Sequence, residues 1–350
     1  MIRFKKIGLR RVQVIGLVLF VLIGLLHQFI AREAGEGRIG GLIPYAANTI
    51  DRDNRNVSPF GTQNIPSLYY RHWLGTDPIG RDVLAGLISG TNVALKVGIV
   101  AVGLSVLIGI ILGFLSGYYG DKTLRLRRRH FFISVVISLL AFFYLYYGGG
   151  IIQLVAIVIL GIVGLLIVRH SNRYNTSGMA LPLDQFIMKS IEIFSSLPDI
   201  FIVLVLLSIF KTQSLWNVVL VIALVKWPTV TRFTRAEILK IKEQDYIHSL
   251  ETLGLPDWKI FKDTVIPLAI SPVLIASAFS FASAILMEST LSFLGIGLPP
   301  DLVTWGSILT EARSHFSSWW LALFPGLSIY LVILLFNSIG DRMNDYLRGI

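Results

Sequence analysis

Three carboxylates lie within or beside long apolar stretches of this sequence, where a charged side chain is costly and usually has a specific partner or task. They are Glu192, Asp199 and Glu288. Asp199 directly follows Pro198, and a proline removes one backbone hydrogen bond of a helix and frees a carbonyl. This pattern predicts a kinked and polar site in the middle of a helix. A carboxylate there could bind an ammonium group, or it could be satisfied by a neighbouring helix.

Two further charged residues have simpler expected positions. Glu288 is followed by Ser289 and Thr290 at the end of its apolar stretch, which indicates a helix-end or gate residue. Lys226 lies close enough to one end of its stretch for its long side chain to carry the ammonium group to the membrane surface.

Motifs of enzymes and metal sites are absent from the sequence. It contains no G-x-x-x-x-G-K-[ST] to hold nucleotide phosphates, no H-E-x-x-H and no G-x-S-x-G. With no cysteine, disulfides and thiolate metal sites are excluded. The 6 histidines stand singly, without the spacing of metal ligands. We therefore expect a chain that is not an enzyme and that holds no metal or cofactor.

The composition is typical of a protein whose main solvent is lipid. The chain of 350 residues is 54% hydrophobic and 15% charged, and its mean hydropathy is +0.71, far from the averages of soluble domains. Its net charge of +10 lies beside apolar stretches, where anionic headgroups and membrane topology account for basic residues. We expect contact with a lipid bilayer and no binding of nucleic acid.

The elements that must position these residues are membrane-spanning helices. A span needs about 20 mostly apolar residues, because it crosses about 30 Å of hydrocarbon at 1.5 Å per residue with every backbone amide bonded inside the helix. The sequence predicts an all-α polytopic membrane protein with about eight spans. They are Val12–Ile30, Val93–Leu115, Phe131–Tyr147, Ile151–Val168, Phe186–Phe210, Leu215–Val230, Ile266–Met287 and Trp319–Ile339.

The basic residues also predict an orientation. Cytoplasmic segments of membrane proteins are enriched in Lys and Arg, and residues 1–11 carry five basic and no acidic side chains: Arg3, Lys5, Lys6, Arg10 and Arg11. This places both termini in the cytoplasm. It makes residues 31–92 extracytoplasmic and residues 231–265 cytoplasmic.

Each of these two long segments contains a predicted local structure. In 31–92, Gly75 to Pro78 indicates a turn with Pro78 at the first position of a helix that lies flat on the membrane. In 231–265, apolar and charged residues alternate at helical spacing, Gly254 ends the helix, and a short helix from near Asp257 ends at Pro267. Pro267 also starts the following span, where its missing N–H is not needed. The apolar face of this second unit needs a membrane or a partner protein.

From residue 72 onward the sequence resembles the inner-membrane permeases of binding-protein-dependent ABC importers, in particular the second permease of dipeptide, oligopeptide and nickel systems. Four stretches in the order of the family carry the resemblance. They are His72–Val83 with Gly113–Gly120; Asp184, Lys189, Glu192 and Leu197-Pro198; Lys242–Ile247 with Leu253-Gly254 and Pro267; and Glu288–Gly297 with Trp305-Gly306, Glu311–Arg313 and Leu323–Gly326.

The resemblance implies a role for each group of residues. The third stretch would be the loop that docks on the ATPase, with Asp245, Tyr246, Leu250, Glu251, Leu253, Gly254 and Pro267. Pro198, Asp199 and Glu288 would belong to the translocation path or its gate, where Asp199 could meet the ammonium end of a peptide. The extracytoplasmic motif would comprise Gly75, Thr76, Asp77, Gly80, Arg81 and Asp82.

The resemblance also implies partners and a place in the cell. We expect a multi-pass protein of the cell inner membrane that forms a path with a homologous permease, together with ATP-binding-cassette ATPase subunits and an extracytoplasmic solute-binding protein. The cargo would be a dipeptide, an oligopeptide, a nickel chelate or another small solute. An ion-coupled secondary transporter is the alternative, but it would need internal repeats and ion ligands in broken helices. A membrane enzyme would need clustered catalytic groups.

Two features depart from the family pattern. The docking loop usually carries Glu-Ala-Ala before its glycine, and His248, Ser249 and Leu250 occupy those positions here. About 60 residues, from about 121 to 183, are inserted and contain the third and fourth spans. We expect residues 1–92 to form an anchor and extracytoplasmic segment, and residues 93–350 to form the permease domain with this insertion.

Overall fold

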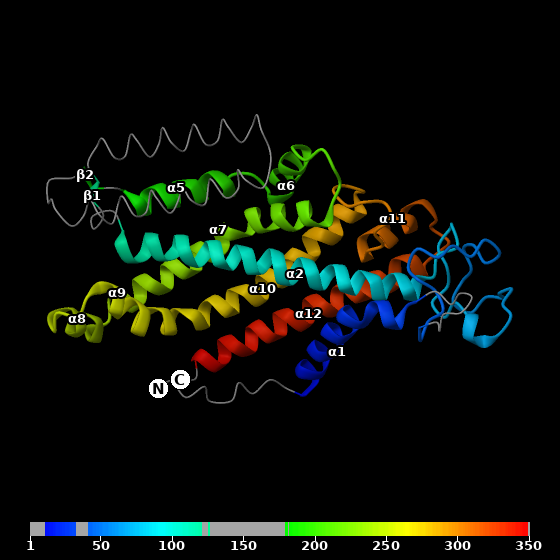
Figure 1. The fold of residues 1–350 in the computed structure, drawn as a ribbon, viewed down its shortest axis with the longest axis horizontal. Helices are drawn as coiled ribbons and strands as arrows, with labels where there is room; N and C mark the ends of the chain where they lie inside the picture. The colour runs from blue at the N-terminus through cyan, green and yellow to red at the C-terminus, as the bar shows by residue number, and fades with distance from the viewer. Residues whose placement is uncertain (1–10, 33–40, 121–124, 127–178, 181, 349–350) are drawn as a thin grey trace.

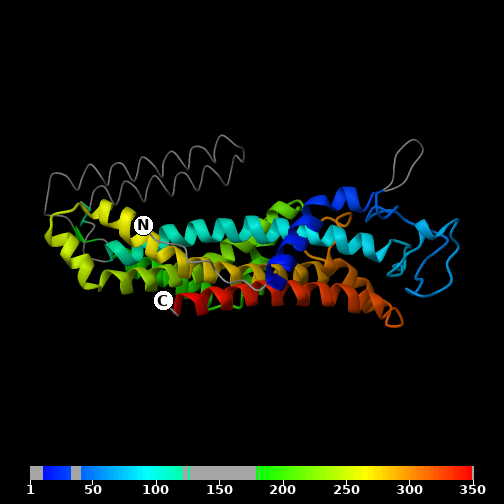
Figure 2. The same ribbon diagram turned by 90° about the horizontal axis from the view of Figure 1, so that it is seen from below.

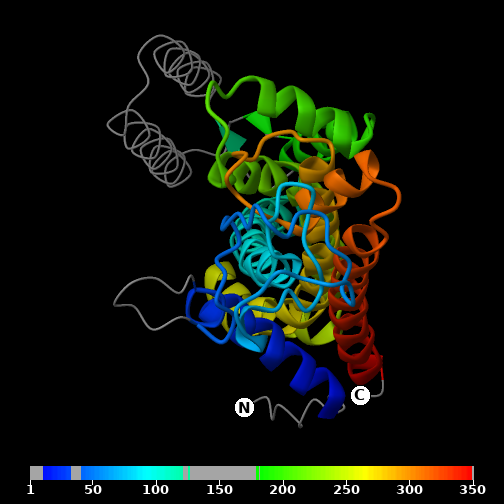
Figure 3. The ribbon, with the colours of Figure 1, turned by 90° about the vertical axis from the view of Figure 1, so that its right-hand side faces the viewer.

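The computed structural model describes residues 11–32, 41–120, 125–126, 179–180 and 182–348. Four long helices run along the long axis of the molecule (Figure 1): α2 (Val83–Phe114), α7 (Leu215–Lys242), α10 (Ile266–Phe293) and α12 (Trp320–Arg348). A fifth, α1 (Arg11–Ile30), crosses them obliquely (Figure 2). Viewed from one end, α2 lies in the middle, with α1 and α12 on one side and α5 and α6 on the other (Figure 3).

The prediction of an all-helical membrane protein is confirmed. Within the described residues, five helices are long and apolar enough to cross a membrane, or six if one bent pair counts as a single span. These six correspond to six of the eight predicted spans. The other two, at 131–147 and 151–168, lie outside the described residues.

Close packing of α2 on α7 depends on three glycines spaced four residues apart. A Cβ added to Gly109 would lie 2.6 Å from Val230, and one added to Gly113 would lie 2.6 Å from Thr234 Cβ. At Gly117 the nearest atoms belong to Arg235 and Ile238, at 3.1 Å. Small residues at this spacing let two helices approach in lipid, where van der Waals contact replaces the hydrophobic effect as a driving force.

The predicted span Phe186–Phe210 is broken, not merely kinked. α5 (Leu183–Ser195) and α6 (Asp199–Ser208) meet at 91°. Pro198 has extended backbone angles, φ −58° and ψ 136°, and the residue before a proline is disfavoured in the helical region. The chain therefore leaves the helix after Ser195 and starts a new one at Asp199.

At one end of the molecule, short helices join the long ones. α7 continues as one helix to Lys242, and α8 (Asp245–Thr252) follows. α9 (Asp257–Ile260) then passes through a π-helical turn, η3 (Phe261–Val265), directly into α10. The short helix does not end at Pro267, as predicted, but continues into α10. Pro267 does lie in the first turn of α10, at the start of the predicted span.

The last turn of α2 and a small strand pair lie at the same end. The turn is π-helical, η2 (Leu115–Tyr119), and β1 (Arg125–Leu126) pairs antiparallel with β2 (Met179–Ala180). Arg125 pairs with Ala180, and Leu126 pairs with Met179.

The opposite end carries an irregular cap. Residues 41–82 form loops with one short 3₁₀ helix, η1 (Leu68–Tyr70), and α11 (Trp305–Ser314) lies at this end too (Figure 1). The expected flat helix beginning at Pro78 is wrong. The Asp77 side chain accepts the N–H groups of Ile79 and Arg81, which makes a turn. The next helix is α2 itself, which begins at Val83, ten residues before the predicted second span.

Candidate functional site

The first predicted path residue, Asp199, forms an ion pair inside the membrane region. Lys226 Nζ lies 2.7 Å from Asp199 Oδ2, joining the first turn of α6 to the middle of α7. The expectation that Lys226 reaches toward the membrane surface is wrong, because the break at Pro198 brings a carboxylate within its range. The two side chains differ in exposure, 12% for Lys226 and 48% for Asp199.

The face that carries this ion pair is chemically mixed. Near it Arg232 Nη2 donates to Ser195 Oγ at 2.9 Å, and Lys189 pairs with Glu192 at 2.7 Å. On the opposite side of the molecule the exposed residues of α1 between Val12 and Leu26 are all apolar. Charged groups inside membranes face water-filled cavities or other polar groups. The other exposed side chains of α5, α6 and α7 are mostly apolar, among them Phe186, Phe201 and Leu220, so the charged groups form polar spots on an apolar face.

Glu288 lies inside the protein. Its side chain is 1% exposed, five residues before the end of α10 at Phe293. Ser292 Oγ donates to its Oε1 at 2.7 Å and Ser289 Oγ donates to its Oε2 at 3.3 Å. A buried carboxylate needs such partners. Through these bonds Glu288 stabilises the last turns of α10, against which α11 packs.

The helix α11 packs tightly on this part of α10. A Cβ at Gly306 would lie 2.3 Å from the Ser289 carbonyl oxygen. Thr310 Oγ1 donates to the Phe293 carbonyl at 2.9 Å, and Trp305 Nε1 donates to the Leu87 carbonyl of α2 at 2.9 Å. Two motifs that lie apart in the sequence, around Glu288 and around Trp305, therefore form one unit.

The predicted docking loop contains α8, which is attached by one face. Ile247 is buried, and Leu250 packs beside it on a cluster that includes Ile238 and Ile260. Tyr246 and Leu253 are exposed, Leu253 by 77%. Leu250, between them on the same side of the helix, is half-buried. Spaced seven residues apart, the two exposed side chains lie on the same outer face of the helix.

Gly254 ends α8 in a left-handed conformation, with φ +74°. Its N–H donates to the Glu251 carbonyl at 2.9 Å, and the Leu255 N–H donates to the Leu250 carbonyl at 3.3 Å. This pair of hydrogen bonds is the Schellman arrangement that closes many helices. Glu251 itself is exposed and lies 3.3 Å from His248.

An ion pair that the sequence did not reveal connects α5 with the extension of α7. Arg235 Nε and Nη2 donate to Asp184 Oδ1 and Oδ2, each at 2.5 Å, and Ser116 Oγ also donates to Asp184. Bidentate pairs of this kind fix orientation as well as distance. Lys242 Nζ, one helix turn before α8, donates to the Tyr118 carbonyl at 2.9 Å. The docking loop is therefore joined to the ends of α2 and α5.

The predicted extracytoplasmic motif forms a compact, hydrogen-bonded cap. Thr76 Oγ1 donates to the Asn54 carbonyl at 2.6 Å, and Arg81 Nε donates to Asp77 Oδ2 at 2.6 Å. Arg81 also reaches Glu311 of α11 at 3.5 Å. Gly80 has φ +96°, and a Cβ there would lie 2.0 Å from the Asp51 carbonyl oxygen, so only glycine fits. Gly75, with φ +80°, is similarly enclosed.

His72 is the residue of this cap whose importance the sequence did not show. It is fully buried between two carboxylates, with Nδ1 2.8 Å from Asp82 Oδ2 and Nε2 3.2 Å from Asp51 Oδ2. Tyr45 stacks on its ring at 4.2 Å. Burial tends to lower the pKa of His72, but the hydrogen bonds to Asp82 and Asp51 outweigh it and raise that pKa. Asp82 also caps α2 through the Ala85 N–H.

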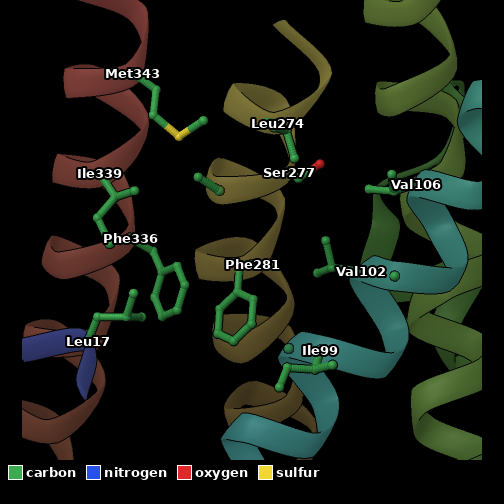
Figure 4. Close-up of a pocket in the computed structure, with 13 residues that line it drawn as sticks. Leu17, Ile99, Val102, Val106, Leu274, Ser277, Phe281, Phe336, Ile339 and Met343 are labelled. Carbon is green, nitrogen blue, oxygen red and sulfur yellow. The ribbon is translucent and has the colours of Figure 1, made fainter. Parts of the chain in front are cut away.

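A separate hollow of about 400 Å³ lies between α1, α2, α10 and α12. Its lining is almost wholly apolar, and Phe281 and Phe336 stack at 3.8 Å in its wall (Figure 4). Ser277 is the one hydroxyl-bearing residue that lines it. Asp199, Lys226 and Glu288 lie elsewhere. Across the described ranges, no group of three or more His, Cys, Asp or Glu side chains is arranged to hold a metal.

Comparison with known proteins relates this arrangement to a family. Residues 178–348 match the binding-protein-dependent transport system inner membrane component. Over 275 residues the chain is 30% identical to the dipeptide transport system permease protein DppC of Haemophilus influenzae, which covers 78% of this chain and 72% of that relative. The chain belongs to this permease family.

Two further relatives of the permease have related names. The glutathione transport system permease protein GsiD of Pectobacterium atrosepticum is 28% identical over 308 residues, which is 87% of this chain and 79% of the relative. The dipeptide transport system permease protein DppC of Alkalihalophilus pseudofirmus is 27% identical over 277 residues, 79% of this chain and 71% of the relative. The resemblance predicted from the four stretches is confirmed.

The family match covers a defined part of the permease. It begins just before α5 and ends with α12, so it includes the Asp199–Lys226 pair, α8 and the Glu288 unit. The helices α1 and α2 and the cap of 41–82 precede it. The roles of the individual residues within this region remain predictions.

Proposed function

We propose that this permease works in an ATP-driven importer for peptides or similar small solutes. It would form the translocation path together with a homologous permease. ATP-binding-cassette subunits would hydrolyse the nucleotide, and an extracytoplasmic solute-binding protein would deliver the cargo. Peptide cargo is proposed because the relatives described above are named for dipeptide and glutathione transport.

The geometry of α8 carries the proposal. This short helix is anchored through Ile247 and leaves Tyr246 and Leu253 exposed, and amphipathic helices dock into grooves of partner proteins through such apolar residues. Its attachments to α2 and α7 would transmit a displacement of the ATPase to the spans. The cap of 41–82 lies at the opposite end, where a solute-binding protein would dock (Figure 1).

The orientation follows from the same assignment. We propose that α8 and both termini lie in the cytoplasm, because the basic residues are concentrated in the segments on that side. We retain the division into residues 1–92 and 93–350 with an insertion at about 121–183, although the second span begins at Val83.

We assign the path to the face of α5, α6 and α7, with Pro198 and Asp199 in its wall. The polar groups on this face support that choice. Glu288 would support a gate formed by α11, because it is hydrogen-bonded beneath the contact between α10 and α11.

Transport by the purified complex tests the proposal. The chain is purified with its associated subunits, reconstituted in proteoliposomes with the binding protein, and supplied with a radiolabelled dipeptide. We expect uptake that requires hydrolysable ATP and stops with a non-hydrolysable analogue. Uptake by the isolated chain, driven by a proton or sodium gradient without nucleotide, would contradict the proposal and favour an ion-coupled secondary transporter.

A further inference from the structure

The Asp199–Lys226 ion pair lies well inside α7, a helix long and apolar enough to cross a membrane. Lys226 follows the start of α7 at Leu215 by eleven residues, which corresponds to about 16 Å along a helix. The hydrocarbon core is about 30 Å thick. Charged groups at this depth are costly, and they persist where they are paired or where they face a polar cavity. This pair satisfies the first condition, and the exposure of Asp199 indicates the second.

The pair is open on one side. Lys226 is mostly enclosed, with its side chain 12% exposed, whereas the Asp199 side chain is 48% exposed. Within the described part of the chain, Lys226 is the one recorded partner of the Asp199 carboxylate, through Oδ2. An aspartate can accept several hydrogen bonds and a lysine can donate three. Both groups therefore retain capacity for a ligand that approaches from the exposed face.

An ion pair that only holds two helices together is expected to have more hydrogen bonds than Asp199–Lys226 has. The Asp184–Arg235 pair joins α5 to α7 through two bonds at 2.5 Å and a third from Ser116, and its side chains are 21% and 26% exposed. Asp199 and Lys226 are joined by one bond, beside the break at Pro198, with exposed Leu197 and Phe201 on either side of Asp199. The single contact can be exchanged for bonds to a ligand without breaking a bidentate pair.

We propose that Asp199 and Lys226 recognise zwitterionic solutes, an inference that rests on the proposed import function. The ammonium of the solute binds Asp199, and its carboxylate binds Lys226. One ion pair is thereby exchanged for two, and the site stays neutral at every stage. A solute that lacks one of its charges leaves Asp199 or Lys226 without a charged partner, which costs most at the largely enclosed Lys226.

The length of a dipeptide suits this arrangement. Two extended residues span about 7 Å, so the terminal ammonium and carboxylate are too far apart to bind each other directly. The two termini are still close enough together for the ammonium to contact Asp199 while the carboxylate contacts Lys226, because these two side chains lie side by side. Free amino acids and short peptides share this chemistry, whereas peptides with a capped end do not.

The absence of cysteine in the natural sequence makes a direct test simple. Leu197→Cys places a reporter thiol on the exposed side of the break beside Asp199. Val18→Cys places a matched reporter on the apolar face of α1, where Val18 is 49% exposed and Leu197 is 56% exposed. Both are introduced into the full complex in membranes and treated with a charged maleimide. The rate of labelling is measured with and without alanylalanine, N-acetyl-alanylalanine and alanylalanine amide.

We expect Leu197→Cys to react faster with the maleimide than Val18→Cys. Free alanylalanine should slow the reaction of Leu197→Cys far more than either capped peptide does. Asp199→Asn should weaken protection by the free dipeptide about tenfold and remove its advantage over the N-acetyl form, as for the loss of one hydrogen bond to a charged group. Lys226→Gln should remove the advantage over the amide. Glu237→Gln, in the pair with Lys240 near the end of α7 that leads to α8, should leave protection unchanged.

Two outcomes would overturn the proposals separately. If Leu197→Cys reacts no faster than Val18→Cys, this face is not the aqueous path, and both the path assignment and the recognition site are wrong. If Leu197→Cys reacts rapidly but free and capped peptides protect it equally, the path stands and zwitterion recognition is wrong. Equal loss of protection toward all three peptides in Asp199→Asn would mean that the ion pair only holds α6 on α7.

Discussion

His72 Nδ1 lies 2.8 Å from Asp82 Oδ2, which fastens the cap of residues 41–82 to the start of the central helix α2. Asp82 uses its other oxygen to cap that helix through the Ala85 N–H at 2.7 Å. Asp51 contacts the second ring nitrogen of His72. A single buried imidazole thus connects residues 51, 72 and 82, and the cap's position depends on the charge of His72.

The stability of the cap should therefore depend on pH. The raised pKa of His72 means that its stabilisation is complete below about pH 6.5, the usual pKa, and is lost as pH rises through the folded-state value. For Asp51, burial raises the pKa, but bonds from Asn54, His72 and the Asp53 N–H outweigh it and lower that pKa. Its stabilisation is present above about pH 3.9 and is lost as pH falls. The pair should stabilise the cap most between about pH 4 and 6.5.

Limited proteolysis at Arg52 and Arg55, which are exposed in the cap, measures this dependence. We expect cleavage to accelerate from pH 6.5 upward in the natural chain, and His72→Gln to remove that rise. His248→Gln, a change at an exposed histidine of α8, is the control and should preserve it. A pH profile that His72→Gln does not alter would contradict this account.

Gly254→Asp should separate the permease from its ATPase subunits. The left-handed φ of +74° strains any residue with a Cβ, so the closure of α8 should be lost and Leu253 displaced. A Cβ at Gly254 meets nothing within 4 Å, so the transmembrane core should remain folded. We expect normal membrane insertion and much lower recovery of ATPase subunits in the purified complex.

A matched change is available at Gly295, which ends α10 at the other end of the molecule. Its φ is +72°, and a Cβ there also meets nothing within 4 Å. Gly295→Asp should impose similar strain without affecting ATPase association. Normal complex yield and transport with Gly254→Asp would show that α8 is not the docking element.

Gly113→Leu should destabilise the contact between α2 and α7. A side chain at this position meets Thr234 Cβ at 2.6 Å and the Thr231 carbonyl oxygen at 2.9 Å, and overpacking of this kind costs about 1–3 kcal/mol. Gly103, on the same helix, has nothing within 4 Å of a Cβ. In detergent, we expect a lower melting temperature for Gly113→Leu and little change for Gly103→Leu; equal effects would contradict the packing described for α2.

Two substitutions of Glu288 test separately whether the volume or the charge of its side chain is required. Glu288→Gln keeps the volume and one acceptor oxygen for Ser292, whereas Glu288→Ala leaves a cavity and two serine hydroxyls without their acceptor. We expect near-normal folding and transport for Glu288→Gln, and a loss of stability of about 2–4 kcal/mol for Glu288→Ala. A folded Glu288→Gln protein without transport would instead mean that the charge itself is required.

Several elements could be predicted because their signals are local. The spans follow from runs of apolar residues, and Gly254 as the end of α8 follows from its residue type after an amphipathic segment. The errors concern how one helix continues into the next. The break at Pro198 reaches 91° and α6 packs against α7, a contact that the sequence pattern did not indicate. A π-helical turn joins the short helix to α10, so no helix ends at Pro267.

The candidate site contains ion pairs between residues far apart in the sequence, which no short-range pattern could predict. Lys226 and Asp199 are 27 residues apart, and Asp184 and Arg235 are 51 apart. A lysine inside one apolar stretch and an aspartate inside the preceding stretch were nevertheless a usable signal, since charges in lipid require partners. His72 gave a weaker signal in the sequence. The two carboxylates that contact it, Asp82 and Asp51, lie 10 and 21 residues away along an irregular segment.

By itself, the sequence determined that this is a helical membrane permease and where most of its spans lie, because the thickness and dryness of lipid impose length and apolarity on each span separately. Only the tertiary structure decided which charges meet and which side of α8 remains exposed. Those properties depend on how helices pack against one another, and packing brings together residues that are far apart along the chain.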